Sequence, residues 1–261
     1  ENNSFAHPDF YLLTAEEAGK DIKIEQVKVM AKQAAFAPVL SEHKVCIIDD
    51  AGQMTAEAAN SLLKLLEEPP PGWLFILITQ QAERLLPTVL SRVVRLRFDA
   101  PDSSAVQQIL EAKGITQNTQ VLAALAGGSP GRALSYNQAD IFAIRREALD
   151  LLKKLPLQNP FGYIAALGWG EKYDRAAALL LTEQFIYLLR DVLLVQSGAG
   201  GQVYNTDIIA GLDGIAADWP LHTARQGVNA AQEAWQNINK NVSAKNVLEA
   251  LVLKLDLLRK E

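Results

Sequence analysis

The feature that most restricts the fold is a pair of short β-forming runs separated by a helical pattern. Lys44–Asp49 (Lys-Val-Cys-Ile-Ile-Asp) and Trp73–Thr79 are apolar at consecutive positions, which is typical of strands inside a parallel sheet. Between them, Thr55 can cap a helix that carries one apolar stripe, made of Ala59, Leu62, Leu63 and Leu66. Strand, helix and strand in this order predict a right-handed α/β crossover.

Two further segments extend this pattern. Phe10–Leu13 is a short apolar stretch that we expect to form a strand, and Ile24–Ala34 follows it with apolar residues at helical spacing. In Val94–Phe98, apolar side chains alternate with Arg95 and Arg97, which predicts another strand with one solvent-exposed face. The amino-terminal part of the chain therefore predicts an α/β unit built on a parallel sheet with flanking helices.

From Pro101 onward, strand signals stop and helical periodicity replaces them. Six segments carry apolar residues at spacings of three and four: Ser103–Lys113, Thr119–Ala126, Ala139–Lys154, Tyr173–Val195, Ala217–Asn239 and Ala244–Lys260. Gly127–Gly131 interrupts them, and Leu155–Pro160 has the composition of a hinge. We predict three domains: an α/β unit over residues 1–99, a small helical unit over 100–155 and a larger all-α unit over 156–261.

The composition is that of a folded intracellular chain. Of 261 residues, 49% are apolar and 21% are charged, and 25 basic against 30 acidic side chains leave a net charge of −5. This balance argues against a chain that coats DNA through its own phosphate contacts. A single cysteine and three scattered histidines exclude a disulfide framework or a zinc cluster built from this chain alone. With neither a signal peptide nor an apolar run of membrane-spanning length, we expect a cytoplasmic protein.

Asp49 and Asp50 are the first candidates for chemistry. They follow a predicted strand at the edge where open α/β sheets bind ligands, and a carboxylate there can hold the Mg²⁺ of a nucleoside triphosphate. Alternatively, they only end a strand and begin a turn. A phosphate-binding loop needs glycines followed by Lys and then Ser or Thr, whereas Gly19-Lys20 is followed by Asp21. We therefore expect no nucleotide cradle and no intrinsic enzymatic activity in this chain.

Ser91-Arg92 is the second candidate. The residues before it, Leu85–Leu90, suit a short helix with Pro87 in its first turn, which places Arg92 at the carboxyl end. An arginine there can satisfy the terminal carbonyl groups and the helix dipole, which is a structural role. It can also act as an arginine finger, a planar and permanently charged group offered to a phosphate on a neighbouring subunit.

Five phrases in this order resemble a known family. They are His7–Phe10 (His-Pro-Asp-Phe), Lys44–Ala51, Ala58–Pro70 (containing Leu-Leu-Lys-Leu-Leu-Glu-Glu-Pro-Pro), Leu85–Arg92 and Gly127–Leu134. Together they resemble the delta-prime family of bacterial DNA polymerase III clamp-loader subunits, which are AAA+ proteins. The resemblance covers roughly residues 7–134, and beyond it the chain matches only as a helical tail. It implies a partial AAA+ sheet followed by a helical lid and an all-α collar.

The resemblance assigns roles to the strand-end residues. Asp49 and Asp50 fall on the Walker B positions, and Asp50 stands where an active motor carries glutamate, which implies weakened or absent hydrolysis. Thr79 and Gln80 follow the next strand at the sensor 1 position, where Gln80 departs from the small polar residue that is more usual.

The resemblance also assigns roles to two arginines. Ser91-Arg92 matches the first two residues of a Ser-Arg-Cys motif, with Val93 in place of the cysteine, and Arg92 would act on the ATP of a neighbour. Arg132 lies at the sensor 2 position of the lid. Simple solvation or an ion pair at the helix terminus explains Arg132 equally well.

The function implied is that of a non-hydrolysing clamp-loader subunit within the DNA polymerase III holoenzyme, a DNA-directed DNA polymerase. Its expected partners are gamma/tau and delta subunits in a hetero-pentamer, with the sliding clamp and primer-template DNA reached through the complex and no membrane. ATP–Mg would sit on the neighbouring subunit, and zinc only in an amino-terminal region that we expect this sequence to lack, together with a degenerate phosphate loop. The alternatives are a hydrolysing gamma/tau motor subunit and a helical adaptor or DNA-binding regulator on a similar scaffold.

Overall fold

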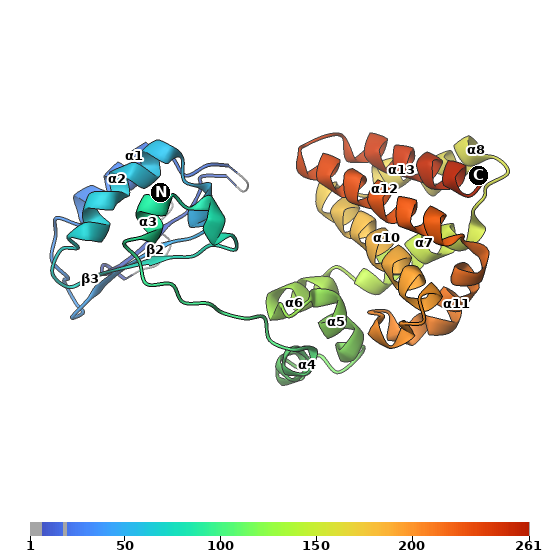
Figure 1. The fold of residues 1–261 in the computed structure, drawn as a ribbon, viewed down its shortest axis with the longest axis horizontal. Helices are drawn as coiled ribbons and strands as arrows, with labels where there is room; N and C mark the ends of the chain where they lie inside the picture. Colours follow the sequence, from blue (N-terminus) through green and yellow to red (C-terminus); the bar gives the residue numbers. More distant parts are fainter. Residues whose placement is uncertain (1–6, 18–19, 261) are drawn as a thin grey trace. The chain divides into compact units, whose positions relative to one another are not determined.

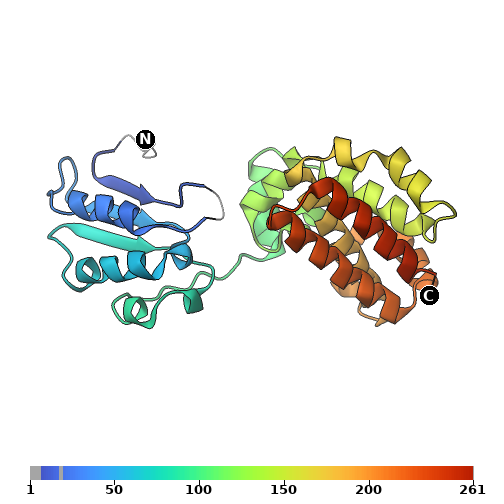
Figure 2. The same cartoon turned by 90° about the horizontal axis from the view of Figure 1, so that it is seen from above.

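The computed structural model describes residues 7–17 and 20–260, without the side chains of residues 170 and 171, so Gly19 of the Gly19-Lys20 pair lies outside the described residues. The chain divides into two compact units, Glu1–Phe98 and Asp99–Glu261 (Figures 1 and 2). This division falls one residue from the boundary predicted at residue 99. A further boundary near residue 155 stays a prediction.

The first unit is built on a parallel sheet of three strands in the order β1-β2-β3. The strands are β1 (Phe10–Leu13), β2 (Lys44–Ile48) and β3 (Trp73–Leu77), and they confirm three of the predicted strands. The helices α1 (Ile24–Gln33) and α2 (Ala56–Glu67) connect them. Because both right-handed crossovers advance in the same direction across the sheet, both helices lie on one side of it (Figure 1).

The face of the sheet below α1 and α2 carries the core of this unit. Its buried members include Leu13, Ile22, Val27, Met30, Cys46, Ile48, Ala58, Leu62 and Trp73. Thr55 caps α2, since its hydroxyl oxygen accepts the N–H of Ala58 at 3.2 Å, as predicted. Burial raises the pKa of the Cys46 thiol to about 12, so this cysteine is an inert core residue.

The opposite face of the sheet is also apolar but remains partly exposed. On β3 and just after it, Leu74, Ile76 and Ile78 are 52%, 39% and 47% exposed. The prediction that Trp73–Thr79 forms a strand inside the sheet is therefore wrong in its placement. The run forms an edge strand, and the two helices of this unit that connect its strands cover only the other face.

The predicted strand over Val94–Phe98 is wrong as well. The segment is not a strand, and Val94, Leu96 and Phe98 are 88%, 76% and 90% exposed. Alternating side chains make such a segment compatible with a strand, but a strand also needs a neighbour for its backbone hydrogen bonds. Among the described residues no strand runs beside it, and the segment instead leads from the first unit into the second.

Between β3 and this segment lie two short elements, the 3-10 turn η2 (Ala82–Arg84) and α3 (Pro87–Leu90). A further 3-10 turn, η1 (Ala51–Gln53), follows β2. Pro87 occupies the first turn of α3, as predicted, because proline needs no backbone donor there. Arg92 consequently lies just past the end of α3.

Asp9, the acidic residue of the His-Pro-Asp-Phe phrase, has a structural role in the first unit. It is 3% exposed, and its carboxylate accepts the backbone N–H groups of Val39, Leu40 and Ser41 at 2.7, 2.7 and 2.8 Å. Burial alone would raise the pKa of Asp9, but these three donors outweigh it and lower the pKa below its ordinary value. Asp9 thereby ties the start of β1 to the loop after α1.

The described residues of the second unit form helices and turns without a strand. The helices are α4 (Ser103–Ala112), α5 (Thr119–Ala126), α6 (Pro130–Gln138), α7 (Ile141–Lys154), α8 (Pro160–Leu167), α9 (Trp169–Lys172), α10 (Arg175–Gln196), α11 (Ile209–Asp218), α12 (Leu221–Asn239) and α13 (Ala244–Leu258), with 3-10 turns η3 (Gly200–Gln202) and η4 (Thr206–Ile208). The long helix α10 packs against α7, α11 and α12 around one continuous apolar core. Within residues 7–17 and 20–260, no helix combines the length and the hydrophobicity that a membrane span requires.

Helix periodicity predicted α4, α5, α7, α10, α12 and α13 and missed the other helices of this unit. The predicted Ala217–Asn239 begins inside α11, and the helix breaks at Trp219-Pro220 before α12 starts. The elements α6, α8 and α9 were not predicted as helices, and neither was most of α11. Each of them contains Gly or Pro, which favours turns, whereas the equally short α5 contains neither.

Candidate functional site

The carboxyl ends of β2 and β3 bring four of the predicted residues to one edge of the sheet. Ala51 donates its N–H to the carbonyl of Ile78 at 2.8 Å, which ties the turn after β2 to the end of β3. Thr79 lies beside Gly52, where an added Cβ would stand 3.0 Å from the Thr79 hydroxyl oxygen. Asp49, Asp50 and Thr79-Gln80 therefore occupy adjacent turns, as expected for the ends of neighbouring parallel strands.

Asp49 and Asp50 form an exposed turn. The Asp49 carboxylate accepts the N–H of Asp50 at 3.0 Å, and Asp50 has a left-handed backbone with φ 50°. The Asp50 carboxylate accepts a hydrogen bond from the side-chain amide of Gln53. These contacts fit the reading in which the two acids end a strand and begin a turn.

A bound Mg²⁺ takes oxygen ligands from one or two carboxylates, from water and from the phosphates of its substrate. No group of three or more His, Cys, Asp or Glu residues that could hold a metal occurs within the part of the chain that the structure describes. Asp49 is exposed and can still contribute one carboxylate, but the sequence has no Gly-Lys-Ser or Gly-Lys-Thr to hold the phosphates. The residues of this edge do not by themselves fit an ATP–Mg site.

Thr79 and Gln80 differ in their surroundings. The Thr79 hydroxyl donates to the carbonyl of Gln81 at 3.1 Å and accepts the N–H of Gln81 at 3.2 Å, so it closes its own turn. Gln80 is exposed. Thr79 thus shapes the loop, and Gln80 presents an amide to solvent at the end of β3.

Arg92 lies at the surface with its guanidinium held on two sides. Its Nε donates to the Glu67 carboxylate at 2.6 Å, and its Nη2 reaches the same carboxylate. Its Nη1 donates to the carbonyl of Thr88 at 2.8 Å and to the hydroxyl of Ser91 at 3.2 Å. The Arg92 side chain remains 32% exposed, so it is neither buried nor turned into the core.

Ser91 belongs to the same cluster. Its hydroxyl donates to the carbonyl of Thr88 at 3.0 Å while it accepts from Arg92. The serine therefore helps to satisfy the last turn of α3, and it holds one nitrogen of the arginine beside it.

Arg132 lies in the second unit. It is in the first turn of α6, where the hydroxyl oxygen of Ser129 accepts its N–H at 3.2 Å. Its guanidinium pairs with Glu183 of α10, donates to the Tyr187 hydroxyl at 2.9 Å and lies 5.3 Å from the ring centre of Tyr136. Burial alone would lower the pKa of Arg132, but the Glu183 carboxylate, followed by the two tyrosines, raises it. Of the two alternatives to the sensor 2 position, solvation and an ion pair, the geometry fits the ion pair, although its partner Glu183 lies on another helix.

Sequence reasoning missed the acidic partners of both arginines. Glu67 stands inside the Leu-Leu-Glu-Glu-Pro-Pro phrase, but it lies 25 residues from Arg92, and Glu183 lies 51 residues from Arg132. No periodicity connects such positions, because each pair joins two separate elements. Only the fold decides which of several glutamates faces an arginine.

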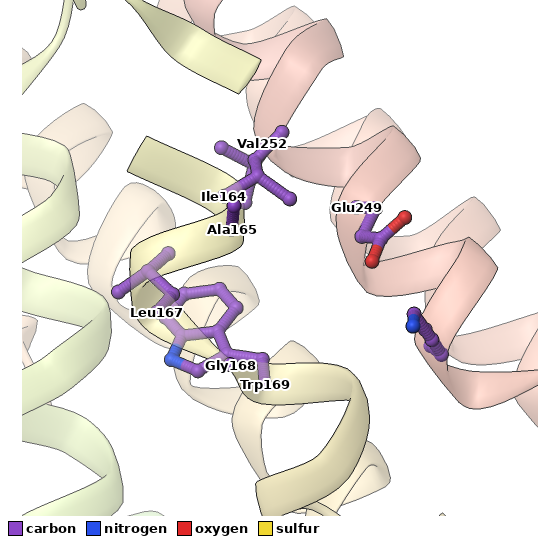
Figure 3. A pocket seen from close by; sticks show the side chains of 8 residues that line it. Ile164, Ala165, Leu167, Gly168, Trp169, Glu249 and Val252 are labelled. Carbon is purple, nitrogen blue, oxygen red and sulfur yellow. The ribbon is translucent and has the colours of Figure 1, made fainter. Parts of the chain in front are cut away.

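The second unit also has a small hollow between the α8–α9 turn and α13 (Figure 3). Ile164, Leu167, Trp169 and Val252 line it together with Glu249. Its volume of about 120 Å³ is well below the 300 Å³ or more that is usual for small-molecule sites. It is too small to hold a nucleotide.

Comparison with known proteins shows to which class of protein this chain is related. A family model described as "DNA polymerase III, delta subunit" matches residues 2–102. The delta-prime subunit of DNA polymerase III from Bacillus subtilis is 28% identical over 252 residues, which cover 95% of this chain and 76% of that protein. The Escherichia coli delta-prime subunit is 32% identical over 228 residues, covering 86% and 65%. The gamma/tau subunit of Mycobacterium tuberculosis is 29% identical over 203 residues, covering 67% and 34%.

These matches define the class of the chain: it is homologous to subunits of DNA polymerase III. Within this class, the resemblance to delta-prime subunits that the motifs predicted is confirmed. The chain spans 54–76% of the length of the first four delta-prime relatives.

Proposed function

We propose that this chain is a non-hydrolysing subunit of a replicative clamp loader, and that it offers Arg92 to ATP bound by a neighbouring motor subunit. The observation that carries the proposal is the place of Arg92. In a homologue of delta-prime subunits, its guanidinium lies at the surface just past the end of α3, and it is still 32% exposed. From such a position an arginine can reach a phosphate outside its own chain.

The proposed role of Arg92 is electrostatic stabilisation of the transition state. Negative charge develops on the phosphoryl group as ATP is cleaved, and a guanidinium at that point stabilises it. Arginine suits this role because it is planar, always charged and able to donate two parallel hydrogen bonds to phosphate. The finger would leave proton transfer and metal binding to the subunit that holds ATP–Mg.

One feature supports a subunit that does not hydrolyse ATP itself. Asp50, which the family resemblance puts at the Walker B glutamate position, has the shorter side chain and accepts a hydrogen bond from the amide of Gln53. Thr79, Gln80 and Arg132 would then be vestiges of sensor positions. Arg132 is already paired with Glu183, which supports a structural role for it.

The rest of the proposal concerns the assembly. The gamma/tau and delta subunits would complete a hetero-pentamer, and the α10–α13 region would pack into its collar. The complex, rather than this chain alone, would load the sliding clamp on primed DNA during replication in the cytoplasm. The net charge of −5 supports contact with DNA through the complex.

The test replaces Arg92 in a reconstituted loader and follows its DNA-stimulated ATPase. Because trans-acting arginines contribute roughly 10³–10⁵ in rate in other phosphoryl-transfer systems, we expect Arg92→Ala to abolish the share of ATPase at the one site it serves. Arg92→Lys keeps the charge but loses the planar fork, and we expect a large loss there too. Size-exclusion chromatography checks that both variants assemble. Unchanged ATPase in an assembled Arg92→Ala loader contradicts the proposal.

A second candidate is a hydrolysing gamma/tau-type motor, which the 29% identity to the Mycobacterium tuberculosis gamma/tau subunit favours. This subunit would bind ATP at its own strand ends, through Asp49 and Asp50. Equilibrium binding of a fluorescent ATP analogue to the full-length protein separates the candidates. Binding that Asp49→Ala removes supports the motor, whereas no binding supports the arginine donor.

A further inference from the structure

The Arg92 guanidinium is held by groups from two different elements. The Glu67 carboxylate, at the end of α2, takes the Nε and Nη2 side, while the Thr88 carbonyl and the Ser91 hydroxyl, at the end of α3, take Nη1. The two contacts from the α3 segment come from residues four and one positions before Arg92 in the chain. Glu67 is the one partner in this cluster that fixes the direction of the side chain relative to another element.

The position of Glu67 is unfavourable for α2 itself. It is the last residue of the helix, where the negative end of the helix dipole disfavours a carboxylate. The ion pair also contributes little to stability, because the side chains of Arg92 and Glu67 are 32% and 48% exposed and water screens them. Neither helix stability nor fold stability accounts for a glutamate at this point.

Orientation of Arg92 does account for it. An unrestrained arginine at a surface samples many rotamers, and ordering it against a phosphate during the reaction has an entropic cost. A partner that orders the guanidinium beforehand removes part of this cost. Since the pair is weak and partly exposed, it can adjust when the phosphate arrives.

We propose that Glu67 is a positioning residue for Arg92, which acts by holding the guanidinium in place before it meets the ATP of the neighbouring subunit. This inference rests on the proposed function of Arg92. The neighbouring Glu68 supplies a matched control. It is also an exposed glutamate, and its described hydrogen bond is that of its backbone N–H to Lys64.

The first measurement uses the isolated chain and needs no ATPase. In ¹H–¹⁵N NMR spectra, the Nε–H signal of Arg92, assigned by its loss in Arg92→Lys, reports how rigid the guanidinium is. We expect a high heteronuclear NOE in the unchanged chain and in Glu68→Gln, and a clear drop in Glu67→Gln. An equal NOE in all three proteins overturns the inference, because Glu67 would then not hold the arginine.

The second measurement uses the reconstituted loader. We expect Glu67→Gln to lower kcat for ATP at the site served by Arg92 by about 3- to 30-fold, the upper value being the full rotamer entropy of an arginine expressed as a rate. KM for ATP should stay unchanged, Glu68→Gln should behave as the unchanged loader, and Glu67→Asp should recover part of the loss. Because Glu67 is half exposed, these variants should keep the fold, which circular dichroism checks.

The outcomes separate the two proposals. If Arg92→Ala leaves the ATPase unchanged, the proposed function itself fails. If Arg92→Ala removes ATPase but Glu67→Gln does not change kcat, only the positioning role fails. A kcat that rises in Glu67→Gln also overturns it, since Glu67 would then be competing with the phosphate for the guanidinium.

Discussion

Charged residues described in the two units differ in their burial. In the first unit, the candidate residues Asp49, Asp50 and Arg92 lie at the surface and are held by local turns or a half-exposed ion pair. In the second unit, Arg145 and Asp191 are buried and hydrogen-bonded to residues from another segment. The contrast shows that charged groups which join separate segments are buried with several partners, whereas the candidate residues at the ends of β2 and α3 stay accessible to solvent.

Asp191 of α10 is one such buried group. It is fully buried, and its carboxylate accepts the N–H groups of Tyr204 and Asn205, the amide of Asn205 and the guanidinium of Arg190 at 2.7–3.1 Å. Asn205 in turn accepts from Arg145 of α7 at 2.9 Å. One carboxylate therefore joins α10, α7 and the segment between η3 and η4.

The largest expected effect comes from breaking this network. Asp191→Ala leaves several buried donors unpaired, and we expect it to lower the free energy of unfolding of the second unit by about 3–5 kcal/mol. Urea unfolding followed by the fluorescence of Trp169 and Trp219 measures it. The control is Asp213→Ala, at an exposed position of α11. If Asp191→Ala lowers the free energy of unfolding no more than the control does, the Asp191 carboxylate does not hold the segment between η3 and η4.

A smaller, pH-dependent effect is expected in the first unit from Asp9→Asn. The folded-state pKa of Asp9 is lowered, so its ionised form stabilises the fold above the pKa of the unfolded chain, and this contribution disappears as pH falls through the folded-state pKa. The unchanged chain should therefore be more stable than Asp9→Asn at neutral pH, and the gap should close below about pH 4.

The fluorescence of Trp73, the tryptophan of the first unit among the described residues, reports the unfolding of that unit. To isolate this signal, the other tryptophans of the chain are replaced by phenylalanine in both proteins. Asp21→Asn, at an exposed position, serves as the control. A gap between the unchanged chain and Asp9→Asn that does not depend on pH would contradict the role of the ionised carboxylate.

The smallest effects compare the two arginine pairs directly. Double-mutant cycles with alanine should give a coupling of about 0–1 kcal/mol for Arg92 with Glu67, because both side chains are substantially exposed. For Arg132 with Glu183, we expect about 1–2 kcal/mol, since Glu183 is only 12% exposed and also accepts the Tyr136 hydroxyl at 2.5 Å. Urea unfolding measures both coupling energies. Equal values would show that the burial of Glu183 does not make the Arg132 pair stronger than the Arg92 pair.

Much of the first unit was predictable because its signals are local. Phe10–Leu13, Lys44–Asp49 and Trp73–Thr79 are short runs of β-formers between helical patterns, and their order alone implies parallel pairing. Thr55 and Pro87 were assigned correctly for the same reason, since a cap or a first-turn proline depends on a few adjacent residues.

One strand prediction and one burial prediction failed where the outcome depended on neighbours. Val94–Phe98 has the alternation of a strand, but no strand among the described residues lies beside it. Trp73–Thr79 contains a strand, as predicted, but its second apolar face is partly exposed. Alternation describes which side chains share a face. It does not say whether another element lies against that face.

The candidate site divides in the same way. Asp49, Asp50 and Arg92 could be singled out as candidates from the residue types and their places at the ends of a strand and a helix, and Thr79 from the family resemblance. A shared edge for the strand-end residues follows from parallel topology. That Glu67 holds Arg92 depended on how α2 packs beside α3, and that Glu183 holds Arg132 depended on which side chains of α10 reach α6. Such contacts join residues far apart in the chain, and only packing brings their charges within hydrogen-bonding distance.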